Sequence, residues 1–305
     1  MEFLDSLFDS KIEEGTAVTV GKFDGIHKGH GILARELMHR QELGLSSCMV
    51  TFVNSPRIAL KKDETPSLIT NREREFMLEN MGLKYLVECP FDERLMTTSA
   101  EDFVALLCDR LNMKFMVVGS DFHFGYKGLG DAALLRRLSQ QYGFELCVVD
   151  KLKKDERDIS STYIREELTA GNISLVNELL GYDYFVWGQV VHGAHLGHSL
   201  GMPTINIMPP KEKLVPKFGV YVTTIELDGR TRHGVTNVGM KPTVTNENKL
   251  GIETHILDYS GDLYGEYIKV TFKDFLRPEM KFDSIEALKA QMNADKLKAH
   301  SFFNK

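Results

Sequence analysis

Short, nearly unbroken apolar runs alternate with helical spacing in the first half of the chain. Four of these runs are rich in β-branched and other apolar residues: 16–20, 47–52, 115–118 and 146–149. Apolar runs of this length predict strands that are buried on both faces. Residues 131–141 place Leu134 and Leu138 four positions apart, with Gly143 behind them, which predicts a helix and its end. Strands alternating with helices predict a Rossmann-like parallel sheet that binds ligands at the carboxyl ends of its strands.

A different pattern begins after Gly181. Strand-like runs follow one another there with turns between them: 185–191, 219–227, 252–258 and 267–272. The turn sequence Asp228-Gly229 is typical of a hairpin, and runs at this spacing predict a small antiparallel barrel. Helical spacing of three apolar residues predicts a terminal helix: Ile285, Leu288 and Met292.

Length and composition set the outer limits. A chain of 305 residues predicts two domains, which the change of pattern places at 1–182 and 183–305. No window approaches the roughly 18 apolar residues of a membrane helix, and the acidic first residues are unlike a secretory signal. We therefore expect a cytoplasmic protein without a membrane partner. The net charge of −6 argues against a protein that coats nucleic acid. Four cysteines form no CxxC pair and are expected in the core, reduced: Cys48, Cys89, Cys108 and Cys147.

One stretch, residues 21–30, follows the first predicted strand and opens a helix. Backbone N–H groups at a helix start attract phosphate, and glycines let a ligand approach the backbone closely. His27 and His30 stand three apart, and each imidazole can donate a hydrogen bond to a phosphate oxygen. Surface histidines or a chance metal pair are the alternatives. The position behind a buried strand favours phosphate, and no third metal ligand of the right type lies nearby.

A second element, residues 159–165, places three hydroxyls ahead of a helix. Ser160, Ser161 and Thr162 precede it, and Arg165 stands in its first turn. Hydroxyls and a guanidinium bind anionic oxygens. Alone, such a sequence is more often a plain helix cap. Together with the histidine pair, anion binding is favoured.

These motifs resemble, in order and over nearly the whole first half, the adenylyltransferase module of bacterial FAD synthetases. The matching stretches are 21–30, Thr51-Phe52, 118–125 and 159–165. The resemblance implies that an FMN phosphate oxygen attacks the α-phosphorus of ATP, giving FAD and pyrophosphate. It assigns His27 and His30 to the triphosphate, and Arg165 with the hydroxyl loop to the leaving pyrophosphate. It also implies further residues of the nucleotide and flavin sites: Gly21, Phe23, Asp24, Gly25, Gly29, Asp121 and Phe124.

The second half carries two candidates for phosphoryl transfer. Thr204 and Asn206, in a Pro-Thr-x-Asn sequence, offer hard oxygen ligands of the kind that suits Mg²⁺. Alone, that sequence is more often an ordinary loop that enters a strand. Glu253 lies in a β-run, where a glutamate is usually a solvent-facing residue.

This half is similar throughout to the riboflavin kinase module, so the chain resembles the bacterial bifunctional riboflavin kinase/FMN adenylyltransferase family. The matching pieces include His192-Gly193, Leu200-Gly201, Asn237-Val238-Gly239 and 262–265. The resemblance implies a six-stranded barrel with Glu253 as general base and Mg²⁺ on Thr204 and Asn206. It implies ATP, riboflavin and FMN as substrates and FAD as product. It places three glycines at the nucleotide: Gly193, Gly197 and Gly201.

Several positions depart from the family pattern. Leu196-Gly197-His198 stands where Arg-Gly-Arg is usual, and Asn54-Ser55-Pro56 where Pro-His-Pro is usual. Ile205 replaces alanine, Lys241 an arginine and Val244 a phenylalanine. Losing two cations beside a triphosphate weakens nucleotide binding or catalysis, so we expect a kinase slower than the family norm.

Three alternatives stay open beside the bifunctional interpretation. One is an FAD synthetase alone, whose barrel serves as a flavin-binding or regulatory module. Another is a non-enzymatic flavin sensor, which has no need of the phosphate-transfer groups. A third is a nucleotidyltransferase for another acceptor, which the flavin-type barrel disfavours. The sequence also leaves a homo-oligomer, the flavin redox form and transfer of FMN between sites open.

Overall fold

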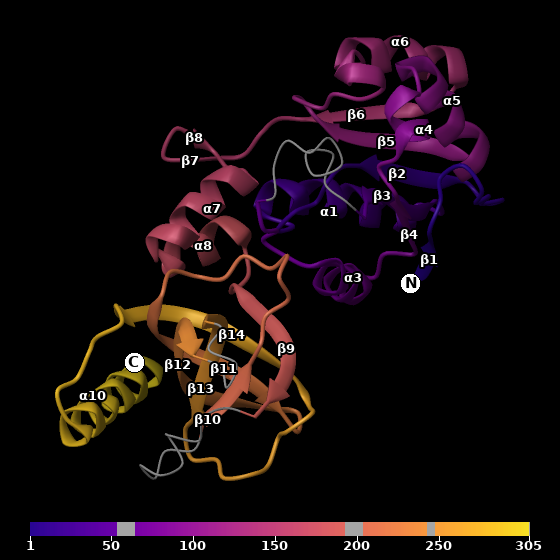
Figure 1. Cartoon of the computed structure of the whole chain (residues 1–305). Helices are drawn as coiled ribbons and strands as arrows, with labels where there is room; N and C mark the ends of the chain where they lie inside the picture. The colour runs from indigo at the N-terminus through magenta and orange to yellow at the C-terminus, as the bar shows by residue number, and fades with distance from the viewer. Residues whose placement is uncertain (54–64, 193–203, 243–247, 305) are drawn as a thin grey trace. The chain divides into compact units, whose positions relative to one another are not determined.

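The chain folds into two units of different architecture (Figure 1). The computed structural model describes residues 1–53, 65–192, 204–242 and 248–304. The first unit comprises Met1–Thr65 and Ile69–Ser160, and the second comprises Pro66–Leu68 and the chain from Ser161 onward. Residues 161–182 thus belong to the second unit. The domain boundary expected at 182/183 stays a prediction.

Six parallel strands form the sheet of the first unit, in the order β1-β4-β3-β2-β5-β6. Their bounds are β1 Glu2–Leu4, β2 Thr16–Val20, β3 Ser46–Phe52, β4 Tyr85–Cys89, β5 Met113–Gly119 and β6 Glu145–Val149. The four predicted strands are β2, β3, β5 and β6. Strand β4 escaped prediction because the buried carboxylate of Glu88 interrupts its apolar run. Strand β1 is short and mostly exposed.

Helices cover both faces of this sheet, as the alternating pattern predicted. Consecutive strand residues point to opposite faces. Val18 and Val50 join a core with α4, α5 and α6, whereas Ala17 and Met49 join another with α1 and α3. The helices are α1 Lys28–Glu42, α3 Asn71–Asn80, α4 Glu93–Thr97, α5 Ala100–Leu111 and α6 Ala132–Tyr142. Short elements complete the unit: η1 Tyr126–Gly128, β7 Lys153–Lys154 and β8 Arg157–Asp158.

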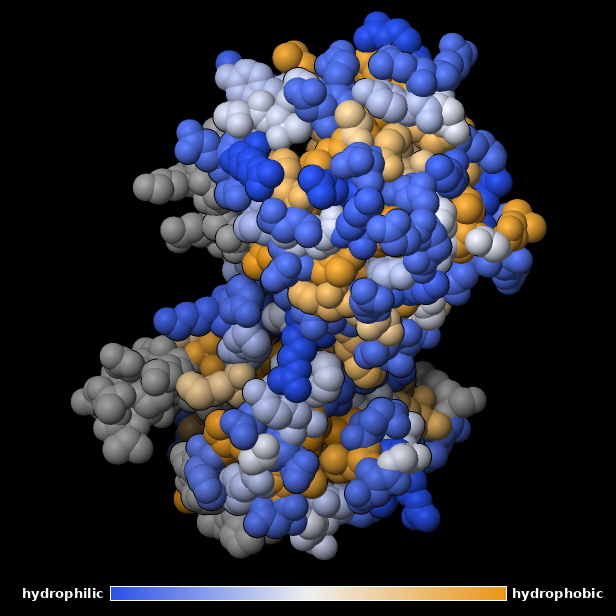
Figure 2. Space-filling view, turned by 90° about the vertical axis from the view of Figure 1, so that its right-hand side faces the viewer, coloured by the Kyte–Doolittle hydropathy of each residue, from blue (hydrophilic) through white to orange (hydrophobic). Residues whose placement is uncertain are grey.

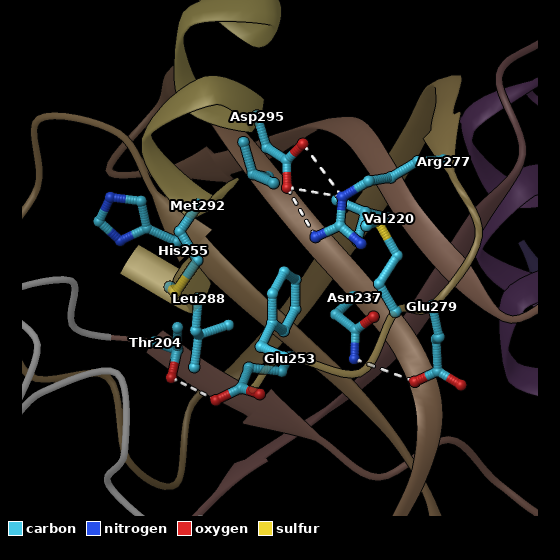
Figure 3. Close-up of a pocket in the computed structure, with 13 residues that line it drawn as sticks. Thr204, Val220, Asn237, Glu253, His255, Arg277, Glu279, Leu288, Met292 and Asp295 are labelled. Carbon is cyan, nitrogen blue, oxygen red and sulfur yellow. Dashed lines mark hydrogen bonds and ion pairs between the residues drawn. The ribbon is translucent and has the colours of Figure 1, made fainter. Parts of the chain in front are cut away.

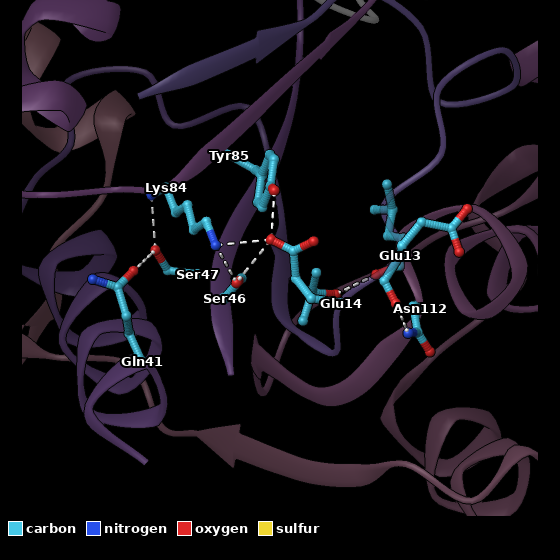
Figure 4. A network of polar contacts seen from close by, with 10 residues as sticks. Glu13, Glu14, Gln41, Ser46, Ser47, Lys84, Tyr85 and Asn112 are labelled. Carbon is cyan, nitrogen blue, oxygen red and sulfur yellow. Dashed lines mark hydrogen bonds and ion pairs between the residues drawn. The ribbon is translucent and has the colours of Figure 1, made fainter. Parts of the chain in front are cut away.

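A polar network ties together the amino ends of the strands, at the edge opposite their carboxyl ends (Figure 4). The Glu14 carboxylate accepts hydrogen bonds from Lys84 Nζ at 2.8 Å and the Tyr85 hydroxyl at 2.6 Å. The hydrogen bond from Lys84, followed by that from Tyr85, lowers the pKa of Glu14 to about 2. Ser47 accepts a hydrogen bond from the backbone N–H of Lys84 and donates to Gln41 on α1. The network therefore holds strand starts and a helix together, away from the ligand-binding edge.

Six antiparallel strands of the second unit close into a barrel, in the order β10-β13-β12-β11-β14-β9. Their bounds are β9 Phe185–Val191, β10 Thr204–Ile207, β11 Gly219–Leu227, β12 Arg230–Pro242, β13 Asn248–Ile256 and β14 Tyr267–Arg277. This confirms the small barrel. Strand β13 ends two residues before Asp258, where the expected run stopped, because Asp258 adopts a left-handed turn with φ of 53°. Strand β12 was missed because it begins with the polar sequence Arg-Thr-Arg-His.

Hydroxyl groups occupy part of the barrel interior. Thr223, Thr236 and Thr254 are buried and hydrogen-bonded in a chain, with 2.8 Å for each contact. Their immediate neighbours along the strands, such as Glu253, therefore point to the outer face. The barrel thus separates an interior of small hydroxyls from an outer face that can carry chemistry.

Three helices accompany the barrel: α7 Ser161–Ala170, α8 Ile173–Leu180 and α10 Ile285–Phe303. The predicted terminal helix is α10. Its Leu288 and Met292 line a pocket, but Ile285, expected on the same face, is 60% exposed. Phe303 near the end of α10 stacks on His233 of β12, with ring centroids 3.7 Å apart. The helix is therefore fixed to the barrel at its carboxyl end.

The surface is mixed in character. Figure 2 shows polar side chains over much of the visible face, with apolar areas broken up between them. Within the described ranges, none of the helices is long and apolar enough to cross a membrane.

A buried ion pair joins α3 to β4 in the first unit. Nε of Arg74 donates to Oε1 of Glu88 at 3.1 Å, and both side chains are about 95% buried. Arg74 also donates to Asn71 at 3.1 Å, and Asn71 donates to the carbonyl of Val53 at the end of β3. The pair therefore anchors α3 beside the carboxyl ends of β3 and β4.

Replacing Arg74 by methionine leaves the Glu88 carboxylate buried without its cation. We expect Arg74→Met to lower the free energy of unfolding by about 3–5 kcal/mol, and the double variant with Glu88→Met to recover most of that loss. Urea unfolding of the full chain measures both. A single variant as stable as the parent protein would show that the pair does not hold this helix.

Candidate active sites

The end of the loop after β2 and the first turn of α1 hold the two predicted histidines, at the carboxyl end of the sheet. Phe23, Asp24 and Ile26 of this loop are buried. His27 is the N-cap of α1, and its Nδ1 accepts a hydrogen bond from the backbone N–H of His30 at 3.4 Å. The two imidazole rings stack with centroids 3.8 Å apart. The stacking places both histidines on the same side of the helix start.

Gly29 makes this arrangement possible. A Cβ atom there would lie 3.1 Å from Nδ1 of His27 and 3.9 Å from the carbonyl oxygen of Ile159. The segment ahead of Ser160 therefore lies against the start of α1. The first turn of α1 has no acidic residue, and N–H groups in a first turn have no carbonyl partner within the helix. These features together are typical of an anion-binding site.

Burial keeps both imidazoles neutral. It lowers the pKa of His27 to about 4, against a smaller opposing effect of the Asp24 carboxylate. Burial also lowers the pKa of His30 well below its usual value, and the neighbouring His27 adds to the effect. Because Nδ1 of His27 accepts a hydrogen bond, its proton lies on Nε2. Within the described ranges, Nδ1 of His30 has no hydrogen-bond partner. An approaching anion would raise both pKa values.

The hydroxyl-and-arginine element crosses from one unit to the other. Ser160 ends the first unit, while Ser161, Thr162 and Arg165 lie in the first turns of α7 in the second. Nε of Arg165 donates to the carbonyl of Pro66 at 3.4 Å. The helix begins at Ser161, two residues earlier than expected, so Ser161 and Thr162 lie inside it and only Ser160 precedes it. The meeting of these side chains with the two histidines stays a prediction.

The other predicted residues of the first unit have different surroundings. Gly21 and Gly25 lie in the loop itself, and the carboxylate of Asp24 accepts a hydrogen bond from the N–H of Ile69 at 3.4 Å. Asp121 is exposed and pairs with Lys151 at 2.8 Å. Phe124 is buried in the core that includes α5 and α6. Their assigned roles at a ligand stay predictions.

The outer face of the barrel carries a pocket of about 260 Å³ beneath α10 (Figure 3). Its walls are largely apolar: Val220, Val235, Met280, Phe282, Leu288 and Met292. Polar side chains from β10, β12 and β13 line one side. An apolar cavity with a few convergent polar groups is typical of a small-molecule site.

Glu253 lies at this pocket with a fixed orientation. The Thr204 hydroxyl donates to Oε1 of Glu253 at 2.7 Å. Nearby, Nδ2 of Asn237 donates to Oε1 of Glu279 at 3.5 Å. A Cβ atom at Gly239 would lie 2.0 Å from the same Glu279 oxygen, so a larger residue there would displace the Glu279 side chain. The pocket therefore brings two carboxylates and their donors to one wall.

Strand register sets the predicted metal ligands beside the predicted base. Asn206 of β10 and Asn237 of β12 both pair directly with Glu253 of β13. Side chains of directly paired residues share a face of the sheet. Ile205 pairs with Thr254 and so points to the opposite face, away from Asn206. Its bulk relative to alanine therefore does not separate the predicted ligands.

A second pocket, of about 310 Å³, meets the first at Thr204, which lines both. The segment 259–264 forms one side of it, and Tyr264 stacks on His192 with ring centroids 3.9 Å apart. Only the backbone of Lys241 is described. Other predicted or departing positions lie outside the described residues: Ser55, Gly193, Leu196, Gly197, His198, Gly201 and Val244.

Sequence reasoning missed an ion pair at the rim of the first pocket. Arg277 forms a fork on the Asp295 carboxylate, with Nη2 to Oδ2 at 2.8 Å, and Gln291 donates to the same carboxylate at 2.9 Å. Asp295 is almost fully buried. The sequence did contain one indication that this carboxylate is buried. Asp295 continues the helical spacing of Leu288 and Met292, so it is a charged residue on an apolar face of the helix.

A Rossmann-like unit with a histidine pair at a helix start, joined to a barrel with a glutamate at a pocket, is the architecture of a nucleotide-dependent transferase. Residues 9–163 match the family described as FAD synthetase, and residues 180–303 match the family described as riboflavin kinase. The chain belongs to the bifunctional riboflavin kinase/FMN adenylyltransferase family.

Individual relatives agree with this membership. The bifunctional riboflavin kinase/FMN adenylyltransferase of Pseudomonas fluorescens is 37% identical over 283 residues, covering 92% of this chain and 91% of that protein. That of Escherichia coli strain K12 is 36% identical over 295 residues, covering 95% and 94%. A crystal structure of a Streptococcus pneumoniae protein, described as a macrolide-efflux protein, has a TM-score of 0.88 and 30% identity, with 98% of each chain covered. The likeness to that structure extends over both units.

The buried imidazoles predict a loss of stability in acid. In the unfolded chain, His27 takes up a proton near pH 6.5. In the folded protein, it takes up a proton only near its pKa of about 4. The free energy of unfolding therefore falls as the pH drops from about 6.5 toward 4. Between pH 7 and pH 5, we expect the free energy of unfolding of His27→Asn to fall by about 2 kcal/mol less than that of the parent protein. Asparagine retains a side chain that can cap the helix.

Urea unfolding at the two pH values gives the measurement. His39→Asn is the matched control, because His39 is exposed on the same helix. The same acid loss in the parent protein and His27→Asn would contradict a neutral His27 in the folded state.

Proposed function

We propose that the chain catalyses two successive reactions of flavin cofactor synthesis. ATP phosphorylates riboflavin to FMN at the barrel, and ATP then transfers its adenylyl group to FMN at the α/β unit, giving FAD and pyrophosphate. The observation that carries this proposal is the presence of both family matches in one chain. The geometry of each unit supports one of the two reactions.

At the α/β unit, an FMN phosphate oxygen attacks the α-phosphorus of ATP, and the bond to pyrophosphate breaks. The attacking phosphate has a second pKa of about 6, so it is ionised near neutral pH and needs no general base. Positioning and stabilisation of charge then do most of the catalysis. His27 and His30 donate to the triphosphate, and Arg165 with Ser160, Ser161 and Thr162 binds the leaving pyrophosphate.

His30→Ala removes one of these donors. We expect adenylyl transfer to fall at least about a hundredfold, which is the usual effect of losing a donor to transition-state charge. Conversion of FMN to FAD by the full chain provides the assay, with His39→Ala as the exposed control on the same helix. An unchanged turnover number would remove His30 from the mechanism.

At the barrel, a riboflavin hydroxyl attacks the γ-phosphorus of ATP, and ADP leaves. An alcohol is a weak nucleophile at neutral pH, so a base that takes its proton accelerates the step. Glu253 is the base, and the hydrogen bond from Thr204 aims its carboxylate. The apolar pocket beneath α10 suits the flavin ring, and the pocket along 259–264 suits the nucleotide. Thr204, which lines both, then stands where the two substrates meet.

The oxygens of Thr204 and Asn206 fit Mg²⁺, which prefers hard oxygen ligands and usually shares them with nucleotide phosphates. The Thr204 hydroxyl keeps two lone pairs while it donates to Glu253. Bound there, Mg²⁺ would neutralise charge on the transferred phosphate. The same proposal includes a cytoplasmic location and no nucleic-acid partner, which the four free cysteines and the net charge of −6 support.

Glu253→Gln retains an acceptor for Thr204 but takes up no proton. We expect riboflavin phosphorylation to fall about 10²–10⁴-fold, with FMN adenylylation unchanged within about twofold. Each reaction is assayed separately, with riboflavin or FMN as acceptor. Glu226→Gln, at an exposed position of β11, is the control.

The alternative of an FAD synthetase alone is the correct one if the parent protein makes FAD from FMN but no FMN from riboflavin.

A further inference from the structure

Three residues from the first half of the sequence are held by the second unit. The strap, Pro66–Leu68, groups with the barrel unit, and the chain returns to the first unit at Ile69. The N–H of Ser67 donates to the carbonyl of Glu212 at 2.7 Å, and the N–H of Leu214 donates to the carbonyl of Ser67 at 2.8 Å. These paired contacts fix the strap as a short parallel bridge.

Lys213 adds a buried charge to this bridge. Its side chain is 2% exposed, and Nζ donates to the carbonyl of Leu68 at 2.7 Å. Nζ also lies 4.5 Å from the centroid of the Tyr184 ring. The Tyr184 hydroxyl lies 3.0 Å from the same Leu68 carbonyl and shares its proton between that carbonyl and the carbonyl of Leu214. Burying an ammonium group is costly, and apolar residues of similar volume often stabilise such places better. The position of the lysine therefore points to a task other than stability.

Hydrogen bonds connect the first residue of the strap, and the residue that follows it, to residues that the proposed function assigns to adenylyl transfer. Arg165 donates to the carbonyl of Pro66 at its first residue. Immediately after its last residue, the N–H of Ile69 donates to Asp24, in the loop that precedes the histidine pair. The Leu68 carbonyl and the Ile69 N–H belong to the same planar peptide group, so a displacement of the carbonyl also moves the donor to Asp24. Four residues of chain carry this connection.

We propose that Lys213 is a positioning residue for adenylyl transfer, although it belongs to the kinase half of the sequence. Together with Tyr184, it fixes the Leu68 carbonyl and so the peptide group whose N–H donates to Asp24. This inference rests on the proposed adenylyl transfer. According to this proposal, part of the affinity for ATP in FMN adenylylation depends on Lys213, a residue of the unit that contains the barrel.

The test compares Lys213→Met with Lys217→Met in the full chain. Lys217 is the matched control, because its Nζ donates to a backbone carbonyl in the same unit, that of Ala170, at an exposed position. We expect Lys213→Met to raise KM for ATP in FMN adenylylation at least about tenfold, the effect of about 1.4 kcal/mol of binding. We expect kcat to change less and riboflavin phosphorylation to stay within twofold.

A structural role for Lys213 predicts another result. Lys213 lies six residues after the end of β10, which carries Thr204, so a disturbed fold would lower kinase activity at least as much as adenylyl transfer. A parallel fall in both reactions overturns the proposal, and so does an unchanged KM for ATP. Absence of adenylyl transfer in the parent protein instead refutes the proposed function.

Two further variants guard against misfolding. Lys213→Arg retains a donor and is expected to keep most of the ATP affinity. Tyr184→Phe removes only a hydroxyl and is expected to raise KM for ATP in the same reaction. Amide hydrogen exchange over residues 65–70 should quicken in Lys213→Met but not in Lys217→Met. Normal exchange there in Lys213→Met, whatever the kinetics, overturns the proposal.

Discussion

Strand register is the constraint on which the barrel site depends. Asn206, Glu253 and Asn237 lie opposite one another on the outer face, while Thr236 and Thr254 hydrogen-bond inside. A slip of one residue would exchange the two sets, placing a carboxylate in the interior and buried hydroxyls outside. The carboxylate would then be buried without partners, which costs more than the about 1–3 kcal/mol of a neutral group, and the hydroxyls would lose their mutual hydrogen bonds. The interior hydroxyl chain therefore does more than fill space, because it penalises every register in which Glu253 misses the pocket.

The first unit fixes its site by backbone geometry instead. Phe23 and Ile26, both in the loop before the histidines, have positive φ values of 47° and 37°. Such conformations cost about 1–3 kcal/mol each for residues other than glycine. Both side chains are almost fully buried, and burial of a side chain this large returns about 1.5–3 kcal/mol. The core therefore holds the loop in a strained path that delivers His27 to the N-cap of α1, before any ligand binds.

Sequence patterns predicted what is local. Strands β9 and β11 were predicted residue for residue, and the histidine motif stood out from its position after a strand. Glu253 was singled out only through the resemblance to the riboflavin kinase module. Contacts between distant residues were not readable. In the sequence, Glu88 only interrupts an apolar run, because its partner Arg74 cannot be identified there. In the same way, the sequence does not show that Asp295 pairs with Arg277, 18 positions away. Lys213 and Leu68 stand 145 positions apart, and no spacing rule joins them.

Charge explains why the histidine site is built from neutral groups. The chain carries a net charge of −6, and its substrates are anionic, so attraction must come from local donors. Two buried cations in contact would repel each other and lose their hydration, whereas two stacked neutral imidazoles avoid both costs. Under the proposed mechanism, the charge of a bound triphosphate raises the pKa of His30, whose Nδ1 has no hydrogen-bond partner among the described residues, and so favours proton uptake there. The positive charge would then exist only while the phosphate that stabilises it is present, and the buried imidazoles are neutral otherwise.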